Sequence, residues 1–410
     1  MKPNKTLLLI LSLFLLSACV EVPEILQDPA SLAAPSATPR ILPATPSLAP
    51  LQTATQPIAP SATAAPPAAS ASEPGPQLIQ IGMYDQKNGW GRSEEALFHT
   101  SDGGQSWQSL QIPIPANHAY FDAAYFDAAS AYVVSTDLGS TPKLLHITRD
   151  SGQTWQEIEL PNANPGSARL VAVSPEILFL FEDLGAGAGS QGVALSRSLD
   201  GGQTWQQNFA HVPGETSNAS LPFGGIKSLP AFLDRDLGFI GGSRPVDNDT
   251  YFFRTEDGGS TWQKQNLPVP ASITGYMALN QTPLTFTGDS QNIIEPVSFS
   301  LPQGDPLLVF FSSSNRGQTW QASAGLPYGG AYHFLNPQTA WVWADGALYK
   351  TNDSGQTWQS LPDGLPEGAS VNSLTFTDPQ NGWALVFELD FQTHLYITQD
   401  GGQTWRLSAP

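Results

Sequence analysis

Seven copies of a short polar motif hold the side chains in this chain that could do chemistry. Each copy fits S/T-x-D/N-x-G-x-S/T-W and places a carboxylate or amide close to two hydroxyl groups. Such groups could act as general acids or bases, or could bind a metal ion through oxygen. The acidic or amide positions are Asp102, Asp150, Asp200, Asp257, Asn315, Asp353 and Asp400, and the final positions are Trp107, Trp155, Trp205, Trp262, Trp320, Trp358 and Trp405.

The repetition of this motif argues against a catalytic role. A catalytic role would require the same active carboxylate at repeated positions all along the chain. The fifth copy also contains Asn315, which keeps the hydrogen-bond acceptor but lacks the charge. A hairpin turn explains both facts, because an Asp or Asn side chain can accept turn N–H groups while the motif glycine adopts a positive φ. We therefore predict a structural turn, with no catalytic residue and no metal ligand in the motif.

Short apolar segments on either side of the motif predict strands. Residues 144–147 precede the second copy, and the alternating residues 156–160 follow it. A second, looser pattern places an aromatic residue five positions after Asp or Asn, as in Asp378 to Trp383, and indicates an earlier turn. Each repeat is then expected to contain strand, turn, strand, loop, strand, motif and strand.

The spacing of the motifs predicts the fold class. Intervals between the motif tryptophans are 48, 50, 57, 58, 38 and 47 residues, as expected for one small antiparallel sheet per repeat. Stacked sheets bury their apolar faces, and closing the ring removes the exposed end faces. We predict an all-β, seven-bladed β-propeller of four-stranded antiparallel blades. The expected blades are 77–112, 119–160, 168–211, 225–267, 274–323, 331–361 and 370–410.

The N-terminal region indicates export and a tether. An apolar run over residues 7–16 ends in Leu-Ser-Ala-Cys at Cys19, which resembles a bacterial lipoprotein signal. The resemblance implies lipidation of Cys19, and an ordinary secretory signal is the alternative. We assign 1–18 to the signal peptide, 19–76 to the lipidated Cys and a disordered Pro/Ala/Ser/Thr-rich tether, and 77–410 to the propeller. The protein is then expected at the cell surface or the periplasmic face of a membrane.

Charge and cysteine content limit the partners. The net charge of −19 becomes −21 when Lys2 and Lys5 leave with the signal segment, which disfavours nucleic acid and anionic lipid headgroups. A single cysteine excludes internal disulfides and thiolate metal clusters. We expect no cofactor. A Ca²⁺ ion held by acidic loops is a weaker alternative, for which the nearest fragment is Asp247-Asn248-Asp249.

Acidic residues gather in the predicted loops between the second and third strands, at the opposite end of each sheet from the motif. Converging negative charges there would attract a cation or a basic protein surface, whereas solvation of a generally acidic protein is the alternative. The candidate binding rim consists of Glu94, Glu95, Asp137, Glu182, Asp183, Asp247, Asp249, Asp345, Glu388 and Asp390.

The motif is identified as the bacterial neuraminidase repeat, or Asp box. Together with Gly-Trp ahead of it, as at Trp90 and Trp383, it resembles the photosystem II assembly and stability factor family across residues 77–410. The resemblance implies a seven-bladed, non-enzymatic assembly or binding scaffold. The acidity of this chain departs from that family, whose members carry an arginine patch.

Two functions follow from these observations. The first is a membrane-anchored, monomeric scaffold, without enzymatic activity, for a protein or surface-polymer partner. The second is a glycoside hydrolase or sialidase-like enzyme with its site in the central funnel. Sialidases bind a substrate carboxylate with three arginines. In the predicted propeller, Arg149, Arg197, Arg254 and Arg316 lie in or beside boxes, which leaves Arg92, Arg169, Arg235, Arg244 and Arg406 as candidates. No His-x-x-x-His pair or Ser-centred nucleophile elbow accompanies them.

Overall fold

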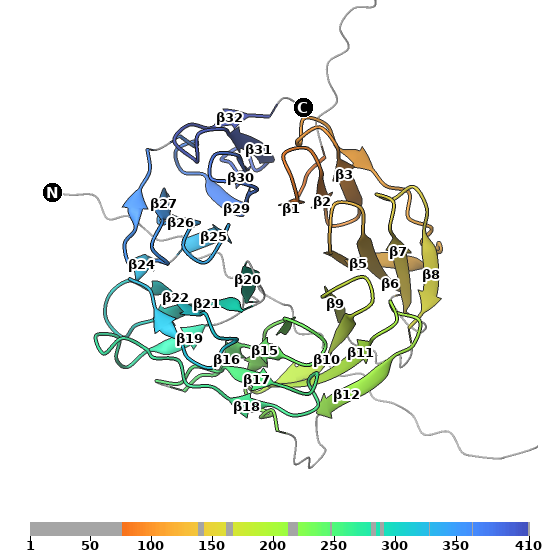
Figure 1. Cartoon of the computed structure of the whole chain (residues 1–410), viewed down its shortest axis with the longest axis horizontal. Coiled ribbons are helices and arrows are strands. Elements are labelled where there is room, and N and C mark those ends of the chain that lie inside the picture. The colour runs from red at the N-terminus through yellow and green to blue at the C-terminus, as the bar shows by residue number, and fades with distance from the viewer. Residues whose placement is uncertain are drawn as a thin grey trace, which may run out of the picture. The chain divides into compact units, whose positions relative to one another are not determined.

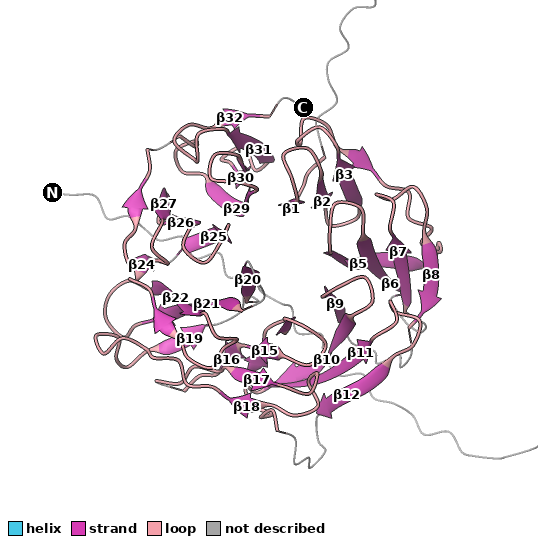
Figure 2. Cartoon of the chain, viewed as in Figure 1, coloured by secondary structure: helices cyan, strands magenta, loops and turns pink. Residues whose placement is uncertain are grey.

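The computed structural model describes residues 76–137, 143–160, 167–211, 220–246, 248–279, 284–287, 291–327, 329–362 and 364–408. They belong to one compact unit, 69–410. The predicted signal peptide, Cys19 and nearly all of the predicted tether lie outside the described residues. Every regular element in the described part is a strand, and no helix there could cross a membrane (Figure 2).

The described strands form seven antiparallel sheets, and six of these contain four strands each. The first sheet contains β1 (Gln80–Met83), β2 (Gly89–Arg92), β3 (Leu97–Thr100) and β4 (Gln108–Ser109). The second contains β5 (His118–Tyr125), β6 (Ala131–Asp137), β7 (Leu144–Thr148) and β8 (Gln156–Glu159). The third contains β9 (Ala168–Ala172), β10 (Leu178–Gly187), β11 (Ser190–Ser198) and β12 (Gln206–His211).

The fourth, sixth and seventh sheets repeat this order. The fourth contains β14 (Ala231–Phe232), β15 (Gly238–Ile240), β17 (Phe253–Thr255) and β18 (Gln263–Lys264). The sixth contains β25 (Gly329–Phe334), β26 (Ala340–Ala344), β27 (Ala347–Thr351) and β28 (Gln359–Ser360). The seventh contains β29 (Ser370–Phe376), β30 (Gly382–Phe387), β31 (Thr393–Thr398) and β32 (Arg406–Leu407). The predicted strand order, with the Asp box between the third and fourth strands, is confirmed in these six sheets.

The fifth sheet differs from the prediction because it has eight strands. It contains β13 (Ile226–Lys227), β16 (Gly242–Ser243), β19 (Met277–Leu279), β20 (Thr285–Thr287), β21 (Asn292–Ser300), β22 (Leu307–Ser313), β23 (Gln321–Ala322) and β24 (Leu326–Pro327). Two of them, β13 and β16, come from the chain region that builds the fourth sheet. A side chain at Gly242 would meet the Ile226 carbonyl oxygen at 2.3 Å, so this close strand approach requires glycine.

Six hydrophobic clusters lie between sheets that are consecutive in the chain, a seventh lies between the first and last sheets, and the sheets surround a common centre (Figure 1). Strands β1, β5, β9, β20, β25 and β29 lie nearest that centre, and β8, β12 and β32 lie on the outside (Figure 1). One Asp-box tryptophan belongs to, or packs against, each cluster. These tryptophans are Trp107, Trp155, Trp205, Trp262, Trp320, Trp358 and Trp405.

The seventh cluster closes the ring by joining the first and last sheets. Leu78 and Ile81 pack there against Trp383 and Leu385. The indole N–H of Trp383 donates to the Gly103 carbonyl at 2.8 Å, across 280 residues of sequence. All four strands of the first sheet come from the start of the propeller and all four of the last come from its end, so side chains rather than an exchanged strand join them. We define this junction as the seam.

Candidate functional site

The Asp box is a self-contained hydrogen-bonded turn. In the last copy, Thr398 Oγ1 accepts the Gly402 N–H at 2.9 Å and donates to Asp400 Oδ1 at 2.9 Å. The carboxylate also accepts the Thr404 N–H at 2.9 Å and the Thr404 hydroxyl at 2.6 Å. Gly402 has a φ of +92°, and a side chain there would meet Leu348 of the preceding sheet. The box therefore shapes its own hairpin and fits it against the neighbouring sheet.

The fifth box shows which of these contacts the turn requires. Asn315 Oδ1 keeps the hydrogen bonds to Ser313 and to the Thr319 N–H, while its amide N–H donates to the Thr319 hydroxyl. An amide therefore replaces the carboxylate without loss of the turn. Elsewhere the charge is stabilised: the hydroxyl and backbone N–H of Thr154 lower the pKa of Asp150 to about 2. Box carboxylates that accept these hydrogen bonds stabilise the hairpin turn and are poor proton donors.

The candidate rim residues do not share one environment. The carboxylate of Glu182 is 1% exposed and lies 2.7 Å from Lys143 Nζ, so its predicted place on an exposed rim is wrong. Asp249 pairs with Arg244 and Lys264, and Asp183 accepts Gln191 Nε2 at 2.8 Å. Neighbouring cations and amides thus occupy these three carboxylates.

The other rim residues include several that are exposed. Glu94 and Glu95 lie in the turn between β2 and β3, and Asp345 lies in the turn between β26 and β27. Glu388 and Asp390 lie in the loop between β30 and β31. Asp247 and the side chain of Asp137 lie outside the described part of the chain. Binding at the rim stays a prediction. Its exposed carboxylates belong to loops of different sheets.

Asp122 is a charged residue whose position the sequence did not reveal. Its carboxylate lies 3.2 Å from Arg92 of the first sheet and accepts the Leu170 N–H of the third sheet at 3.0 Å. Burial raises the pKa of Asp122, and these two contacts oppose the rise. Ser373 makes a matching contact, because its hydroxyl bonds the backbone of Ile81 in the next sheet. Asp122 and Ser373 each hydrogen-bond the inner strand of the neighbouring sheet. We therefore infer that Asp122 links neighbouring inner strands.

The predicted arginine candidates are largely occupied by acidic neighbours. A cleft of about 550 Å³ beside the fourth sheet includes Arg235, Arg254 and Arg316 in its wall. Their partners are Asp236 at 3.0 Å, Glu256 at 2.7 Å and Asp234 at 2.5 Å, respectively. Among the predicted candidates, Arg235 lies in this cleft, whereas Arg92 pairs with Asp122 and Arg244 with Asp249. Each cleft arginine thus has its own carboxylate, which leaves little net positive charge for a substrate acid.

A hydrogen-bonded row of side chains crosses the second sheet. His118 Nδ1 lies 3.2 Å from Ser135 Oγ, which lies 2.9 Å from His146 Nε2. Such contacts resemble an activated serine, but Ser135 and His146 are fully buried, so a substrate cannot reach the hydroxyl. Burial lowers the pKa of His146. His146 is therefore part of the packed interior, and the described residues contain no group of three or more His, Cys, Asp or Glu side chains placed to hold a metal ion.

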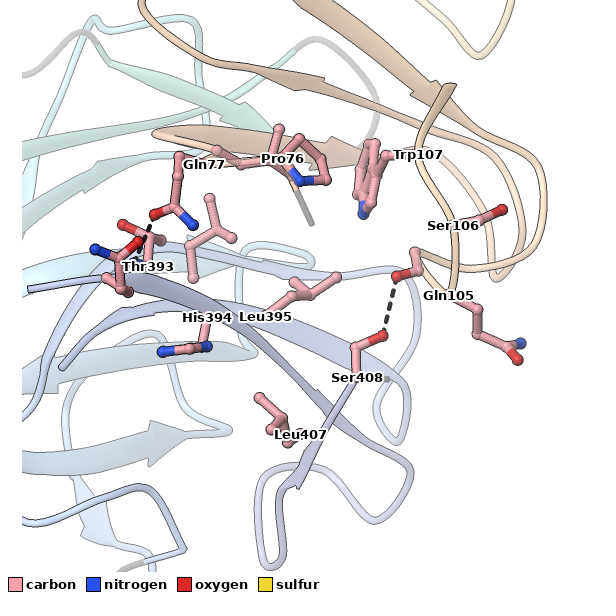
Figure 3. Close-up of a pocket in the computed structure, with 14 residues that line it drawn as sticks. Pro76, Gln77, Gln105, Ser106, Trp107, Thr393, His394, Leu395, Leu407 and Ser408 are labelled. Atoms are coloured by element: carbon pink, nitrogen blue, oxygen red, sulfur yellow. Dashed lines mark hydrogen bonds between the residues drawn. The ribbon is translucent and has the colours of Figure 1, made fainter. Parts of the chain in front are cut away.

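The seam contains an apolar groove of about 330 Å³ (Figure 3). The Gln77 side chain accepts the Thr393 N–H at 3.2 Å, and Ser408 Oγ donates to the Gly104 carbonyl at 3.0 Å. Trp107 lies in the wall, and its indole N–H has no acceptor among the described residues. The wall is formed by Pro76, Gln77, Leu78, Gly104, Gln105, Ser106, Trp107, Leu385, Gln392, Thr393, His394, Leu395, Leu407 and Ser408.

Comparison with known proteins agrees with this architecture. The family model described as Photosynthesis system II assembly factor YCF48 matches residues 71–221, and the BNR/Asp-box repeat model matches residues 396–407. The solved structure of YCF48 bound to D1 peptide superimposes with a TM-score of 0.52 at 19% identity, covering 79% of this chain and 93% of that one. The chain is an Asp-box β-propeller, and its resemblance to the photosystem II assembly factor family is confirmed.

Enzymes share the same fold. The GH74 xyloglucanase from Xanthomonas campestris gives a TM-score of 0.54 at 14% identity, covering 82% of this chain and 54% of that chain. A probable oligoxyloglucan-reducing end-specific xyloglucanase of Neosartorya fischeri is 26% identical over 191 residues. That match covers 41% of this chain and only 23% of the fungal protein. Such distant likeness establishes the fold alone and leaves the activity to be argued from the site.

Proposed function

We propose that this protein is a lipid-anchored, extracytoplasmic scaffold that binds a protein partner without enzymatic activity. In this proposal the eight-stranded sheet counts as one blade of a seven-bladed propeller, the protein is a monomer, and Cys19 carries the lipid. The seam groove is the observation that carries the proposal. Its volume of about 330 Å³ is in the range of ligand pockets, and Trp107, Leu395 and Leu407 make it largely apolar.

The groove suits a peptide segment better than a small charged substrate. Apolar walls would bury side chains of a partner, while backbone groups could meet the polar residues Gln77, Gln105 and Thr393. The superimposable YCF48 structure was solved with a D1 peptide bound, which supports a peptide as ligand of this fold.

Mutation of the groove tests the scaffold function. Leu407 is 51% exposed in β32, so Leu407→Asp should add a charge to the groove without disturbing the core. We expect a protein to co-purify in stoichiometric amount with the lipidated wild-type chain from its native envelope, and the variant to lose it. Leu199→Asp, in the third Asp box, is the matched control and should retain it. Equal recovery with both variants would contradict the groove as the binding site.

A second function is favoured by the xyloglucanase relative alone. A glycoside hydrolase of this fold would need two carboxyl groups about 5 to 10 Å apart in a pocket that admits a sugar. The test is release of reducing ends from xyloglucan by the purified chain. We expect none, and hydrolysis above the background without enzyme would replace the scaffold proposal with the enzymatic one.

Membrane anchoring is tested separately. Cys19→Ser should move the protein from the membrane fraction to the soluble fraction and abolish labelling with radioactive palmitate. Unchanged fractionation and labelling would contradict lipidation at this residue.

A further inference from the structure

The loop after β30 exposes two large apolar side chains. Leu389 is 76% exposed and Phe391 is 79% exposed, more than any other exposed large hydrophobic residue in the described part of the chain. The loop leads directly into Gln392 and Thr393, which line the seam groove. We call residues 387–391 the apolar finger. Large exposed apolar side chains that gather at one place on a surface commonly mark a contact site for another molecule.

The apolar finger has a defined conformation. The Phe391 N–H donates to the Glu388 carbonyl at 3.0 Å, and the Glu388 N–H donates to the Gln392 carbonyl at 3.0 Å. Asp390 accepts the Gln392 N–H at 2.9 Å and lies 3.0 Å from His394 Nε2. Hydrogen bonds on both sides of the tip therefore hold Leu389 and Phe391 in solvent. A preorganised contact loses less conformational entropy when a partner binds.

Phe391 occupies a backbone conformation that costs free energy. Its φ of +63° lies in the left-handed region, and it is the one bulky aromatic residue among the described non-glycine residues with positive φ. Asn or Gly would fit this conformation with less strain, yet the sequence places a phenylalanine there. Its aromatic neighbour Phe387 lies 6.3 Å away between ring centroids, a long contact that offers little compensation within the chain.

Two carboxylates flank the exposed side chains and define the partner's charge. Glu388 accepts the Tyr396 hydroxyl at 2.8 Å, and the His394 contact lowers the pKa of Asp390. Asp390 is therefore negative beside Leu389 at neutral pH, and Glu388 places a second carboxyl group on the other side of Leu389. Anionic lipid headgroups would be repelled, as would a second copy of a chain whose net charge is −19. A surface rich in Lys and Arg complements the finger.

The geometry points to the apolar finger as an anchor that inserts Leu389 and Phe391 into an apolar pocket on a basic protein surface. The inference rests on the proposed scaffold function and names the chemistry of its partner. Beside the finger, the seam groove would receive a neighbouring segment of the same partner, because Gln392 and Thr393 connect the two. The carboxylates of Glu388 and Asp390 would face basic residues around the pocket.

Photo-crosslinking from the finger identifies its neighbour. The lipidated full-length chain carries p-benzoylphenylalanine at position 389 and is irradiated in its native envelope. We expect a crosslink to a protein, which is then purified and titrated against the wild-type chain and its variants. Leu389→Ser with Phe391→Ser should weaken binding about 30-fold, the loss typical of two anchor residues. Glu388→Gln with Asp390→Asn should weaken it about 3-fold and reduce its salt dependence.

The controls separate the finger from the fold and from the groove. Leu199→Ser, which alters an exposed leucine far along the chain, should leave binding unchanged, and all variants should retain the wild-type unfolding midpoint. Crosslinking only to lipid, only to a second copy or to nothing would overturn the inference, as would unchanged binding by the double serine variant. If Leu407→Asp still abolished binding in that last case, the scaffold function would stand without the finger.

Discussion

The hairpins at the Asp-box end of the sheets repeat one set of hydrogen bonds, whereas the loops at the other end differ in length, charge and apolar content. At the box end, each Asp or Asn accepts groups from its own turn, as Asp400 does from Thr404. At the loop end, Asp345 lies in a two-residue turn while Leu389 and Phe391 project into solvent. The residues that repeat in every box therefore build the fold. The loops that vary from sheet to sheet are the candidate binding surfaces.

The largest expected effect is at a buried ion pair near the loop end. Lys143 and Glu182 join the second and third sheets and are 4% and 1% exposed. Lys143→Ala should lower the free energy of unfolding by about 3 to 5 kcal/mol, because it leaves a buried carboxylate without its cation. Urea unfolding measures this loss. The paired change Lys143→Met with Glu182→Leu should recover most of it, and equal losses in both variants would show that packing rather than charge is responsible.

A smaller effect is expected at the box end. Asp257 accepts the Thr261 N–H at 2.8 Å and the Thr261 hydroxyl at 2.6 Å. Asp257→Ala should lower the free energy of unfolding by about 1 to 2 kcal/mol, a range reduced for solvent screening of an exposed carboxylate. Asp257→Asn should cost less, because Asn315 keeps the same turn in the fifth box. If Asn proved as harmful as Ala in urea unfolding, the charge would matter more than the turn.

Acid should weaken the box end in a defined pH window. Hydrogen bonds from threonine hold the pKa of Asp150 and Asp200 at about 2, below the ordinary value of 3.8. The unfolded chain therefore takes up these protons first, so their contribution is complete above about pH 4 and is lost as the pH falls toward 2. The urea midpoint measured from pH 5 to pH 2 should fall less steeply in Asp150→Asn with Asp200→Asn. An unchanged slope would contradict the lowered pKa values.

The smallest effect has the opposite sign. Phe391→Asn should raise the free energy of unfolding by about 0.5 kcal/mol, because Asn tolerates the left-handed region better than Phe. Thermal unfolding of the variant beside Leu389→Asn, which changes a neighbouring exposed residue of the finger, measures the difference. A loss of stability at Phe391 would mean that its ring contributes to the fold, which would weaken its assignment as an external anchor.

Local sequence patterns predicted much of the fold. They could not predict contacts between segments that are far apart in the sequence. The repetition of the box, together with Asn315 in its fifth copy, indicated that the box is a turn. Burial of Glu182 depends on Lys143 in the neighbouring sheet, 39 residues away, which no local pattern could reveal. The finger was also hidden, since Phe387, Leu389 and Phe391 alternate with acidic residues as a strand would, although β30 ends at Phe387. The seam groove combines segments from both ends of the propeller.

The seam also determines the order in which the protein can be completed. Each sheet can pack against the one before it as the chain emerges, but the exposed face of the first sheet meets its partner last. The Ile81 N–H can donate to the Ser373 hydroxyl only after a further 292 residues have been made. Leu78, Ile81 and Met83 therefore stay uncovered until the last sheet is made, and contacts across such a long sequence separation form slowly. Until the last sheet packs against it, this apolar surface is open to aggregation and to chaperone binding.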